Sequence, residues 1–420
     1  MPQRPESGAS LDTWLGYLEQ LHVREIELGL DRVMLVYRKL FRGAMSSRVI
    51  TVAGTNGKGT TVAALDALLR SQGRHTGTYT SPHLHRYNER ICIDGEPASD
   101  AGIVAAFEEV EDARGNTSLT YFEFGTLAAL VVFRDAAPDD LILEIGLGGR
   151  LDAVNIVDPD LAIITTIGVD HVDWLGNDRE TIAFEKAGIL RPGIPALYGE
   201  DDIPKAIIQQ ARAQRVGLRK LGVEFGWADP GRKQIFYEFE GERRQVLLPV
   251  TDIPENSAMN AVQALALLGV DPGQVDLGVL SRLSVPGRFE VIGSEPEIIV
   301  DVAHNPHAAR WLAERLAVSQ TSPGSNTLAV YAGLADKDSL GVIQALKTVV
   351  DHWFLAGLIA PRGLSGAELA ERVASEIEEH YQVCQTIEEA LESALAVARP
   401  VDRILLFGSF ITVAQARQLV

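Results

Sequence analysis

The sequence predicts an α/β protein, in which a P-loop-type domain on a parallel sheet is followed by a smaller, Rossmann-like α/β domain. Apolar runs alternate with helical patterns, a glycine-rich turn joins an early strand to a helix, and a second series of strands follows a Pro-Gly segment. At 420 residues the chain is long enough for two domains with full cores. We expect the first domain at residues 1–285, a linker at 286–296 and the second domain at 297–420.

The first domain should open with a helix and continue into buried strands. Residues 11–21 carry apolar side chains at helical spacing behind Ser10, a residue type that caps helices. Residues 49–53 are mostly β-branched or small and apolar, which predicts a buried strand. Residues 141–145 and 161–167 are continuous apolar runs. Such runs are typical of parallel strands that are covered on both faces.

The rest of the first domain contains two further helices and one charged segment. Residues 177–190 have a helical pattern in which Asn177 and Glu180 show capping-box spacing. Residues 256–268 predict another helix. The charged segment near 216–250 predicts an antiparallel β insertion.

The second domain should follow a hinge at residues 284–289. Its strands are expected at 298–302, 327–332, 352–358 and 403–407, with helices between them. This alternation predicts a second α/β sheet.

The turn at Gly54-Thr-Asn-Gly-Lys-Gly-Thr60 is the most specific local signal. Its glycines allow a tight turn, and backbone N–H groups at the head of the following helix, together with Lys58, predict a phosphate site. The usual pattern is G-x-x-x-x-G-K-[ST], but Val52 stands at the first glycine and Gly59 follows the lysine. This departure makes a plain NTPase less well supported, whereas the prediction of a phosphate site still holds. The alternative to a phosphate site is a glycine-rich turn with a solvated lysine.

The composition excludes several classes of protein. A formal net charge of −19 argues against a nucleic-acid partner and means that anions must be bound by local devices. The two cysteines, Cys92 and Cys384, suit a reducing compartment, so we expect a cytoplasmic protein. No apolar run approaches the ~20 residues that cross a bilayer, so we expect no membrane partner.

Polar side chains follow several predicted strands, at the edge where open α/β sheets bind ligands. Glu144 ends one strand, His171 follows the next, and Ser81 follows a third. These residues could bind Mg²⁺, and the alternatives are a satisfied carboxylate, a structural histidine and a turn serine. Lys186 lies on a predicted helix, where a solvated lysine is the usual explanation.

Taken together, these segments resemble the bacterial dihydrofolate synthase/folylpolyglutamate synthase family, a relative of the Mur cell-wall ligases. The resemblance covers nearly the whole chain and lies in motifs that keep their order, at residues 53–60, 80–84, 119–124, 144–152, 170–171, 185–188, 286–289 and 301–306. It implies an ATPase domain like the central domain of Mur ligases, followed by a glutamate-ligase domain.

The resemblance also implies a role for individual residues. ATP would be bound by Thr55, Asn56, Gly57, Lys58, Gly59, Thr60, Asn256, Arg288 and Asp301. One or two Mg²⁺ ions would be held by Ser81, Glu144 and His171, and Lys186 would carry a CO₂-derived carbamate. The pteroate-side pocket would be lined by Thr120, Tyr121, Phe122, Glu123, Leu151, Asp152 and Ala153. His304 and Ser409 would lie near the incoming glutamate, and catalysis would depend on Lys58, Lys186, His171 and Asp152.

The implied reaction is ATP-driven amide formation through an acyl phosphate. L-glutamate would be added to 7,8-dihydropteroate and to the tail of reduced folates by an enzyme that is a monomer. His304 and Asp152 are both candidates for the base that accepts a proton from the amine.

Two alternatives remain at this point. A Mur-type ligase that acts on a UDP-sugar peptide would share the phosphate turn, although residues 120–124 and the extra Gly59 favour the folate branch. A non-catalytic nucleotide switch would have no need of Glu144, His171 and Lys186 together.

Overall fold

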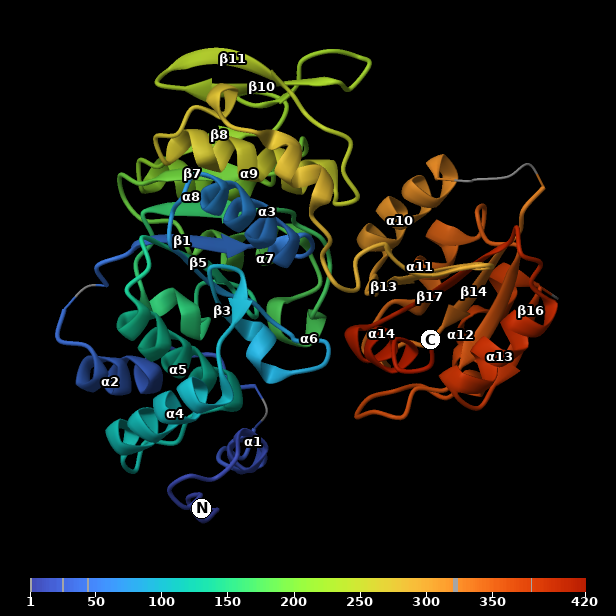
Figure 1. The fold of residues 1–420 in the computed structure, drawn as a ribbon, viewed down its shortest axis with the longest axis horizontal. Coiled ribbons are helices and arrows are strands. Elements are labelled where there is room, and N and C mark those ends of the chain that lie inside the picture. Colours follow the sequence, from blue (N-terminus) through green and yellow to red (C-terminus); the bar gives the residue numbers. More distant parts are fainter. Residues whose placement is uncertain (1, 25, 44, 320–323, 379) are drawn as a thin grey trace. The chain divides into compact units, whose positions relative to one another are not determined.

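The protein divides into two compact units. The structure is a computed structural model that describes residues 2–24, 26–43, 45–319, 324–378 and 380–420. The first unit comprises residues 1–169 and 175–283, and the second comprises residues 170–174 and 284–420. Each unit has its own sheet (Figure 1).

The first unit is built on an eight-stranded sheet with the order β4-β3-β2-β5-β1-β6-β7-β8. The six neighbouring strands β2-β5-β1-β6-β7-β8 pair in parallel. Strands β3 and β4 pair antiparallel and form one edge of the sheet. The carboxyl ends of β2, β5, β1 and β6 therefore meet at one edge. The strands are β1 (Arg48–Ala53), β2 (Thr76–Tyr79), β3 (Ile91–Ile93), β4 (Glu96–Pro97), β5 (Asp140–Glu144), β6 (Leu161–Ile164), β7 (Pro195–Tyr198) and β8 (Gly217–Lys220).

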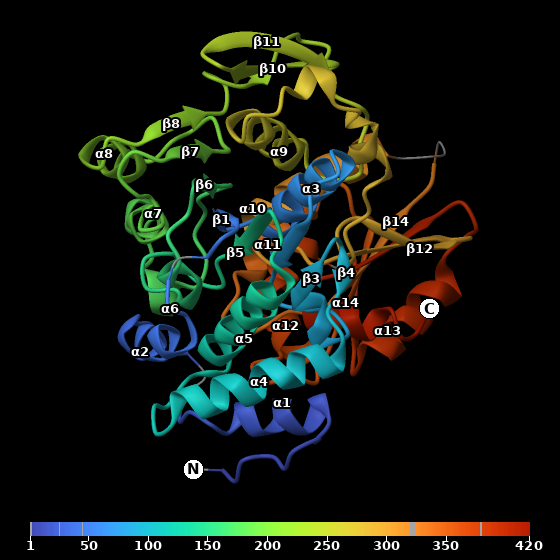
Figure 2. The same ribbon diagram turned by 60° about the vertical axis from the view of Figure 1, so that its left-hand side comes forward.

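Helices cover both faces of this sheet. In both views α3 and α9 lie together on one side of it, and α5, with α4 against it, lies on the other (Figures 1 and 2). The helices are α1 (Leu11–Glu19), α2 (Asp31–Leu40), α3 (Lys58–Ser71), α4 (Asp100–Arg114), α5 (Tyr121–Ala136), α7 (Arg179–Ala187), α8 (Lys205–Ala213) and α9 (Glu255–Leu267). Short 3₁₀ turns are η1 (Tyr87–Arg90), η2 (Ala153–Ile156), η3 (Pro272–Gln274) and η4 (Leu277–Arg282).

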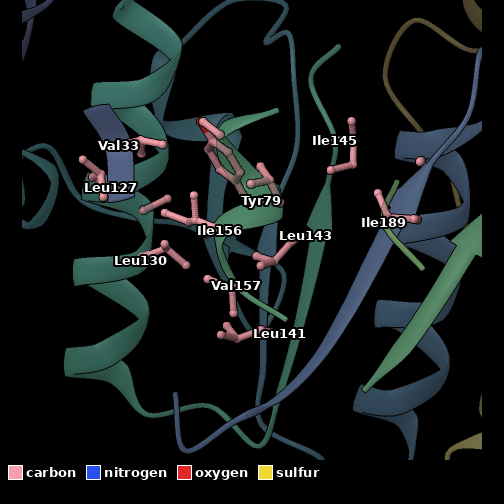
Figure 3. Close-up of a cluster of buried hydrophobic side chains, with 14 of the residues drawn as sticks. Val33, Tyr79, Leu127, Leu130, Leu141, Leu143, Ile145, Ile156, Val157 and Ile189 are labelled. Atoms are coloured by element: carbon pink, nitrogen blue, oxygen red, sulfur yellow. The ribbon is translucent and has the colours of Figure 1, made fainter. Parts of the chain in front are cut away.

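The apolar run of β5 has the role that its sequence predicts. Leu141 and Leu143 point to the face that carries α5, where they pack near Leu127 and Leu130 (Figure 3). Ile142, between them, points to the opposite face and is also fully buried. Burial on both faces explains why this strand contains no alternating polar residues.

The predicted antiparallel insertion is shorter than the segment 216–250. Strands β9 (Gly226–Trp227), β10 (Gln234–Phe239) and β11 (Glu242–Leu247) form an antiparallel sheet in the order β11-β10-β9. Strand β8 belongs instead to the large sheet, because it pairs in parallel with β7.

The second unit contains a six-stranded sheet with the order β12-β13-β17-β14-β15-β16. All pairs are parallel except β12–β13. Its strands are β12 (Glu290–Ser294), β13 (Glu297–Asp301), β14 (Thr327–Tyr331), β15 (His352–Ala356), β16 (Tyr381–Cys384) and β17 (Arg403–Phe407). Its helices are α10 (Pro306–Val318), α11 (Ser339–Leu346), α12 (Gly366–Ile377), α13 (Ile387–Val397) and α14 (Phe410–Ala416).

Two short segments lie outside their expected places. Residues 290–294, expected in the linker, form β12 and hydrogen-bond to β13. Residues 170–174, which include most of α6 (Val172–Leu175), belong to the second unit although they follow a strand of the first. Among the described residues no helix is long and apolar enough to cross a membrane.

The cap of α7 differs from the expected one. The N-cap is Asp178, whose side chain accepts a hydrogen bond from the Thr181 amide at 2.9 Å, so the assignment to Asn177 was wrong. Glu180 is free to act elsewhere, and its carboxylate accepts from the amides of Lys205 and Ala206 at the start of α8.

We therefore expect Asp178→Ala to lower the melting temperature by about 2 °C, because the first turn of α7 loses an acceptor for its amides. Asn177→Ala is the matched control and should leave the melting temperature unchanged. Calorimetry of both variants checks this, and equal shifts would contradict the cap assignment.

Candidate active site

The phosphate turn (residues 54–60) joins β1 to α3 at the carboxyl edge of the first sheet. Gly57 has a φ of 77°, a left-handed conformation that favours glycine, and it directly precedes Lys58, the first residue of α3. A Cβ on Gly54, at a φ of 154°, would lie 1.9 Å from Oγ1 of Thr165. Both glycines are therefore required for the turn to place its backbone N–H groups at the N-terminus of α3, where an anion is favoured.

Residues that follow β6 hold the turn in this shape. The amides of Thr55 and Asn56 donate to the carbonyl oxygen and to Oγ1 of Thr166, both at 2.9 Å. Thr165 Oγ1 donates to the carbonyl oxygen of Asn56 at 2.6 Å. The turn is thus pre-organised by its own neighbours.

Lys186 reaches the same turn from α7. Its side chain is buried, with the residue only 4% exposed, and its Nζ donates to the carbonyl oxygen of Gly54 at 2.9 Å. Helix α7 lies tightly against the loop after β5, since a Cβ on Gly149 would come within 2.8 Å of the Glu185 carbonyl oxygen. The solvated-lysine interpretation of Lys186 is therefore wrong.

A lysine and a carboxylate meet beside the turn. Lys58 Nζ lies 3.9 Å from Oε1 of Glu144 and donates to the Thr55 carbonyl oxygen at 3.3 Å. The other oxygen of Glu144, which is 4% exposed, accepts from the backbone amide of Ser81 at 3.1 Å. The ends of β1, β5 and β2 thus bring together three residues that the sequence singled out.

The buried hydroxyl of Thr60 provides a test of whether this edge suits a phosphate and a cation. The residue is 1% exposed, and its Oγ1 has no hydrogen-bond partner in the part of the chain that the structure describes. A buried hydroxyl of this kind destabilises the fold unless a ligand satisfies it. In the same described ranges no group of three or more His, Cys, Asp or Glu side chains could hold a metal ion. A cation here would need phosphate oxygens as further ligands, which suits Mg²⁺.

Several residues assigned to the pteroate-side pocket also stabilise the fold around them. Thr120 is the N-cap of α5, and Glu123 completes a capping box with it. The second oxygen of Glu123 accepts from Arg32 at 3.0 Å, a contact across 91 residues that no sequence pattern suggested. The ring of Phe122 fills the space beside Gly146, where a Cβ would lie 2.4 Å from it.

Asp152 is a buried carboxylate at the start of η2. Its oxygens accept from the amides of Leu147 and Val154 at 2.8 and 3.0 Å. Burial raises the pKa of Asp152 to about 7, although these amides and the charge of Lys58 oppose the shift. Its neighbours Leu151 and Ala153 are half-buried and buried.

The other predicted residues fall into the two units as follows. Asn256, on α9, lies in the first unit, where its side-chain Nδ2 donates to the Gly199 carbonyl oxygen at 3.3 Å. His171, Arg288, Asp301, His304 and Ser409 lie in the second unit.

In the second unit, Asp301 ends β13 and is fully buried. Its oxygens accept from the amides of Phe289 and Ala303 at 2.8 and 2.7 Å. Burial raises the pKa of Asp301, and the positive charge of Arg288 opposes this. Ser409 caps α14 by accepting from the Thr412 amide at 3.0 Å.

His304 takes part in a charged cluster around Asp170. Its Nε2 lies 3.2 Å from one oxygen of Asp170, and Nζ of Lys337 lies 2.5 Å from the other. Burial disfavours the ionised form of Asp170, but the hydrogen bond from His304 and the charge of Lys337 together lower its pKa. This cluster anchors the segment that carries His171 to the second unit. Lys337 was not predicted from the sequence, although it stands in the polar loop after β14.

Comparison with known proteins agrees with this arrangement. The Mur ligase middle domain matches residues 52–268, and the Mur ligase glutamate ligase domain matches residues 287–410. The chain is 41% identical to the dihydrofolate synthase/folylpolyglutamate synthase of Escherichia coli, over 99% of this chain and 97% of that protein. It is 39% identical to the corresponding protein of Haemophilus influenzae, over 96% of each chain.

Solved structures give the same result. E. coli FolC in complex with DHPP and ADP has a TM-score of 0.92 and 40% identity, with 99% of each chain covered. The bifunctional folylpolyglutamate synthase/dihydrofolate synthase of Yersinia pestis, complexed with AMPPNP and Mn ion, has a TM-score of 0.89 and 43% identity, again with 99% of each chain covered.

The two-unit fold, the phosphate turn and the Lys58–Glu144 pair define an ATP-dependent amino-acid ligase of the Mur type. Within that class, the chain belongs to the dihydrofolate synthase/folylpolyglutamate synthase family.

The raised pKa of Asp152 predicts a pH-dependent stability. A carboxyl group with a pKa of about 7 in the folded state and about 4 when unfolded binds more protons in the folded state. Its contribution to stability is present below pH ~4 and is lost as the pH rises to ~7. The free energy of unfolding should therefore decline between pH 5 and pH 8. We expect Asp152→Asn to remove the part of this decline that Asp152 causes, on the order of a few kcal/mol. Urea unfolding at both pH values measures it.

The exposed Asp112 offers the control, since Asp112→Asn should keep the decline of the unmodified protein. Identical pH dependence in all three proteins would contradict the raised pKa.

Proposed function

We propose that this chain joins L-glutamate to 7,8-dihydropteroate, giving dihydrofolate, and extends the glutamate tail of reduced folates at the expense of ATP. The observation that carries the proposal is the Lys58–Glu144 pair at the head of α3, in a chain whose relatives are bifunctional enzymes of this kind. A UDP-sugar peptide as acceptor, the main alternative, receives no support from these relatives.

The reaction proceeds in two balanced steps. An oxygen of the acceptor carboxylate attacks the γ-phosphorus of ATP, the bond to the β-phosphate oxygen breaks, and ADP leaves. The amine of glutamate then attacks the carbonyl carbon of the acyl phosphate. Phosphate leaves, and the amine nitrogen gives up a proton.

The first step brings two anions together, so positive charge must lie between them. Lys58 supplies a charge that is already oriented, because it is held at the start of α3 by Thr55 and Glu144. The remaining N–H groups of the first helical turn point along the helix axis toward a bound phosphate. Thr60 gives its otherwise unsatisfied hydroxyl to the same ligand.

A divalent cation fits the same edge. Ser81, Glu144 and His171 would be its protein ligands. When bound, such a cation would neutralise charge on the phosphate oxygens. The Yersinia pestis relative contains Mn ion with AMPPNP, which supports a requirement for metal here.

Substrate contacts complete the proposal. Asn256, Arg288 and Asp301 bind the nucleotide. The pteroate group lies against residues 120–123 and 151–153, and His304 and Ser409 lie near the incoming glutamate. We also propose a cytoplasmic location, which the free thiols of Cys92 and Cys384 support. The proposal of a monomer rests on the resemblance to the family alone.

We further propose that Lys186 is carbamylated. Its uncharged amine attacks CO₂ and loses a proton, which converts a buried cation into an anion. Burial of Lys186 against the Gly54 carbonyl oxygen supports the proposal, because that site keeps the amine out of bulk water.

We expect Lys186→Ala to lose at least about 100-fold in kcat, a loss that bicarbonate does not restore and that a short carboxylic acid partly does. Lys205→Ala, on the surface-facing start of α8, is the control and should keep its rate. Full activity of the Lys186 variant would remove the carbamate from the account.

Mass spectrometry of the ligation products tests the proposed function itself. With ATP and Mg²⁺, we expect glutamate to be added to dihydropteroate and, in successive single additions, to a reduced folate. A UDP-sugar peptide should remain unmodified. Ligation of glutamate or another amino acid to that peptide alone would contradict the proposal.

A further inference from the structure

Arg90 of the first unit is held in place by aromatic rings and a histidine, and the described residues give it no carboxylate partner. It is the last residue of η1, it is half-buried, and its Nε donates to Nδ1 of His83 at 2.8 Å. Its guanidinium lies over two aromatic rings, 5.5 Å from the centroid of Tyr87 and 5.7 Å from that of Tyr121. Two cation–π contacts and one side-chain hydrogen bond hold the guanidinium in its position.

The adjacent acidic residue, Glu89, is already engaged. Both oxygens of the adjacent Glu89 accept from backbone amides, those of Leu84, His85 and Arg86. Within the described residues, no carboxylate forms an ion pair with Arg90 at 4.0 Å or less. Arg86, by contrast, pairs with Asp100 at 2.9 Å on the surface. In a chain of net charge −19, an oriented arginine without an acidic partner is suited to an anion from outside.

The position of Arg90 indicates which anion this is. His83 follows Ser81 by two residues, and the Ser81 amide binds Glu144 at the edge proposed for the cation and the phosphate. Tyr121 belongs to the segment proposed for the pteroate group. Arg90 touches both segments, so it lies where the pteroyl end and the reacting end of one acceptor molecule would meet.

We propose that Arg90 binds a carboxylate of the acceptor substrate, and that His83 is a positioning residue that orients the guanidinium. The inference rests on the proposed function. The carboxylate comes either from dihydropteroate, where it is the reacting group, or from the glutamate tail of a folate. Guanidinium and carboxylate form two parallel hydrogen bonds, which a neutral amide cannot reproduce.

Equilibrium binding without turnover tests this assignment. The probes are dihydropteroate and its carboxamide, and a reduced folate and its tail diamide, each in the presence of ADP. For Arg90→Gln we expect about a 10- to 100-fold higher Kd for at least one of the two acids and no change for the amides. Arg90→Lys should recover part of the affinity, and His83→Ala should show a smaller loss of the same kind. Arg86→Gln is the matched control and should bind all four ligands normally.

The outcomes are distinct. A loss confined to dihydropteroate identifies the reacting carboxylate, and a loss confined to the folate identifies the tail. Unchanged binding of both acids by Arg90→Gln would overturn the inference, as would an equal loss of acids and amides. If the unmodified protein bound none of the four ligands, the proposed function would fail, and this inference with it.

Discussion

The shape of the backbone between Gly54 and Thr60 is the constraint on which the rest of the structure depends. Three residues from outside the turn maintain it: Thr165 and Thr166 after β6, and Lys186 from α7. These residues lie more than a hundred positions away along the chain, so the shape of the turn depends on the parallel sheet that brings them together. The buried strands β1, β5 and β6 serve function by fixing the loops at their carboxyl ends, which is the usual arrangement in open α/β sheets.

A chain with a net charge of −19 can bind a phosphate and a carboxylate only where local groups outweigh the overall field. The first unit offers few such groups. Lys58 is the first residue of α3, and Arg90 lies over the rings of Tyr87 and Tyr121. Several residues expected to contact substrate are also caps: Thr120 and Glu123 for α5, Ser409 for α14 and Asp152 for η2. A cap fixes its own side chain, and a fixed side chain loses less entropy when it binds a ligand.

Much of the fold could be predicted from sequence because the signals were local. Continuous apolar runs gave β5 and β6, and the glycine spacing gave the turn before α3. The predictions were less accurate where tertiary contacts decide. Residues 217–220 join the large sheet by pairing with β7, and residues 290–294 pair with β13, although neither segment has a strong strand pattern. Asn177 and Asp178 are both good caps, and only the path of the chain into α7 selects the second.

In the candidate site, too, the residues with a local sequence signal could be predicted and those placed by tertiary contacts could not. Lys58, Glu144 and Ser81 could be found from sequence because each follows a strand whose end lies at the same sheet edge. Arg32 and Lys337 could not, since their partners are 91 and 167 residues away and an isolated basic residue carries no periodic signal. Resemblance to a family supplied what physical reasoning alone did not, most clearly at Lys186, whose burial becomes visible only in the folded structure.

The central claim is that the acceptor carboxylate becomes covalently linked to the γ-phosphate before glutamate is joined. Dihydropteroate labelled with oxygen-18 in both carboxylate oxygens tests this most directly, because the oxygen that attacks phosphorus must leave with it. The account predicts that one labelled oxygen per turnover appears in inorganic phosphate and that the other stays in the new amide. Phosphate free of the label, with ligation proceeding normally, would contradict it.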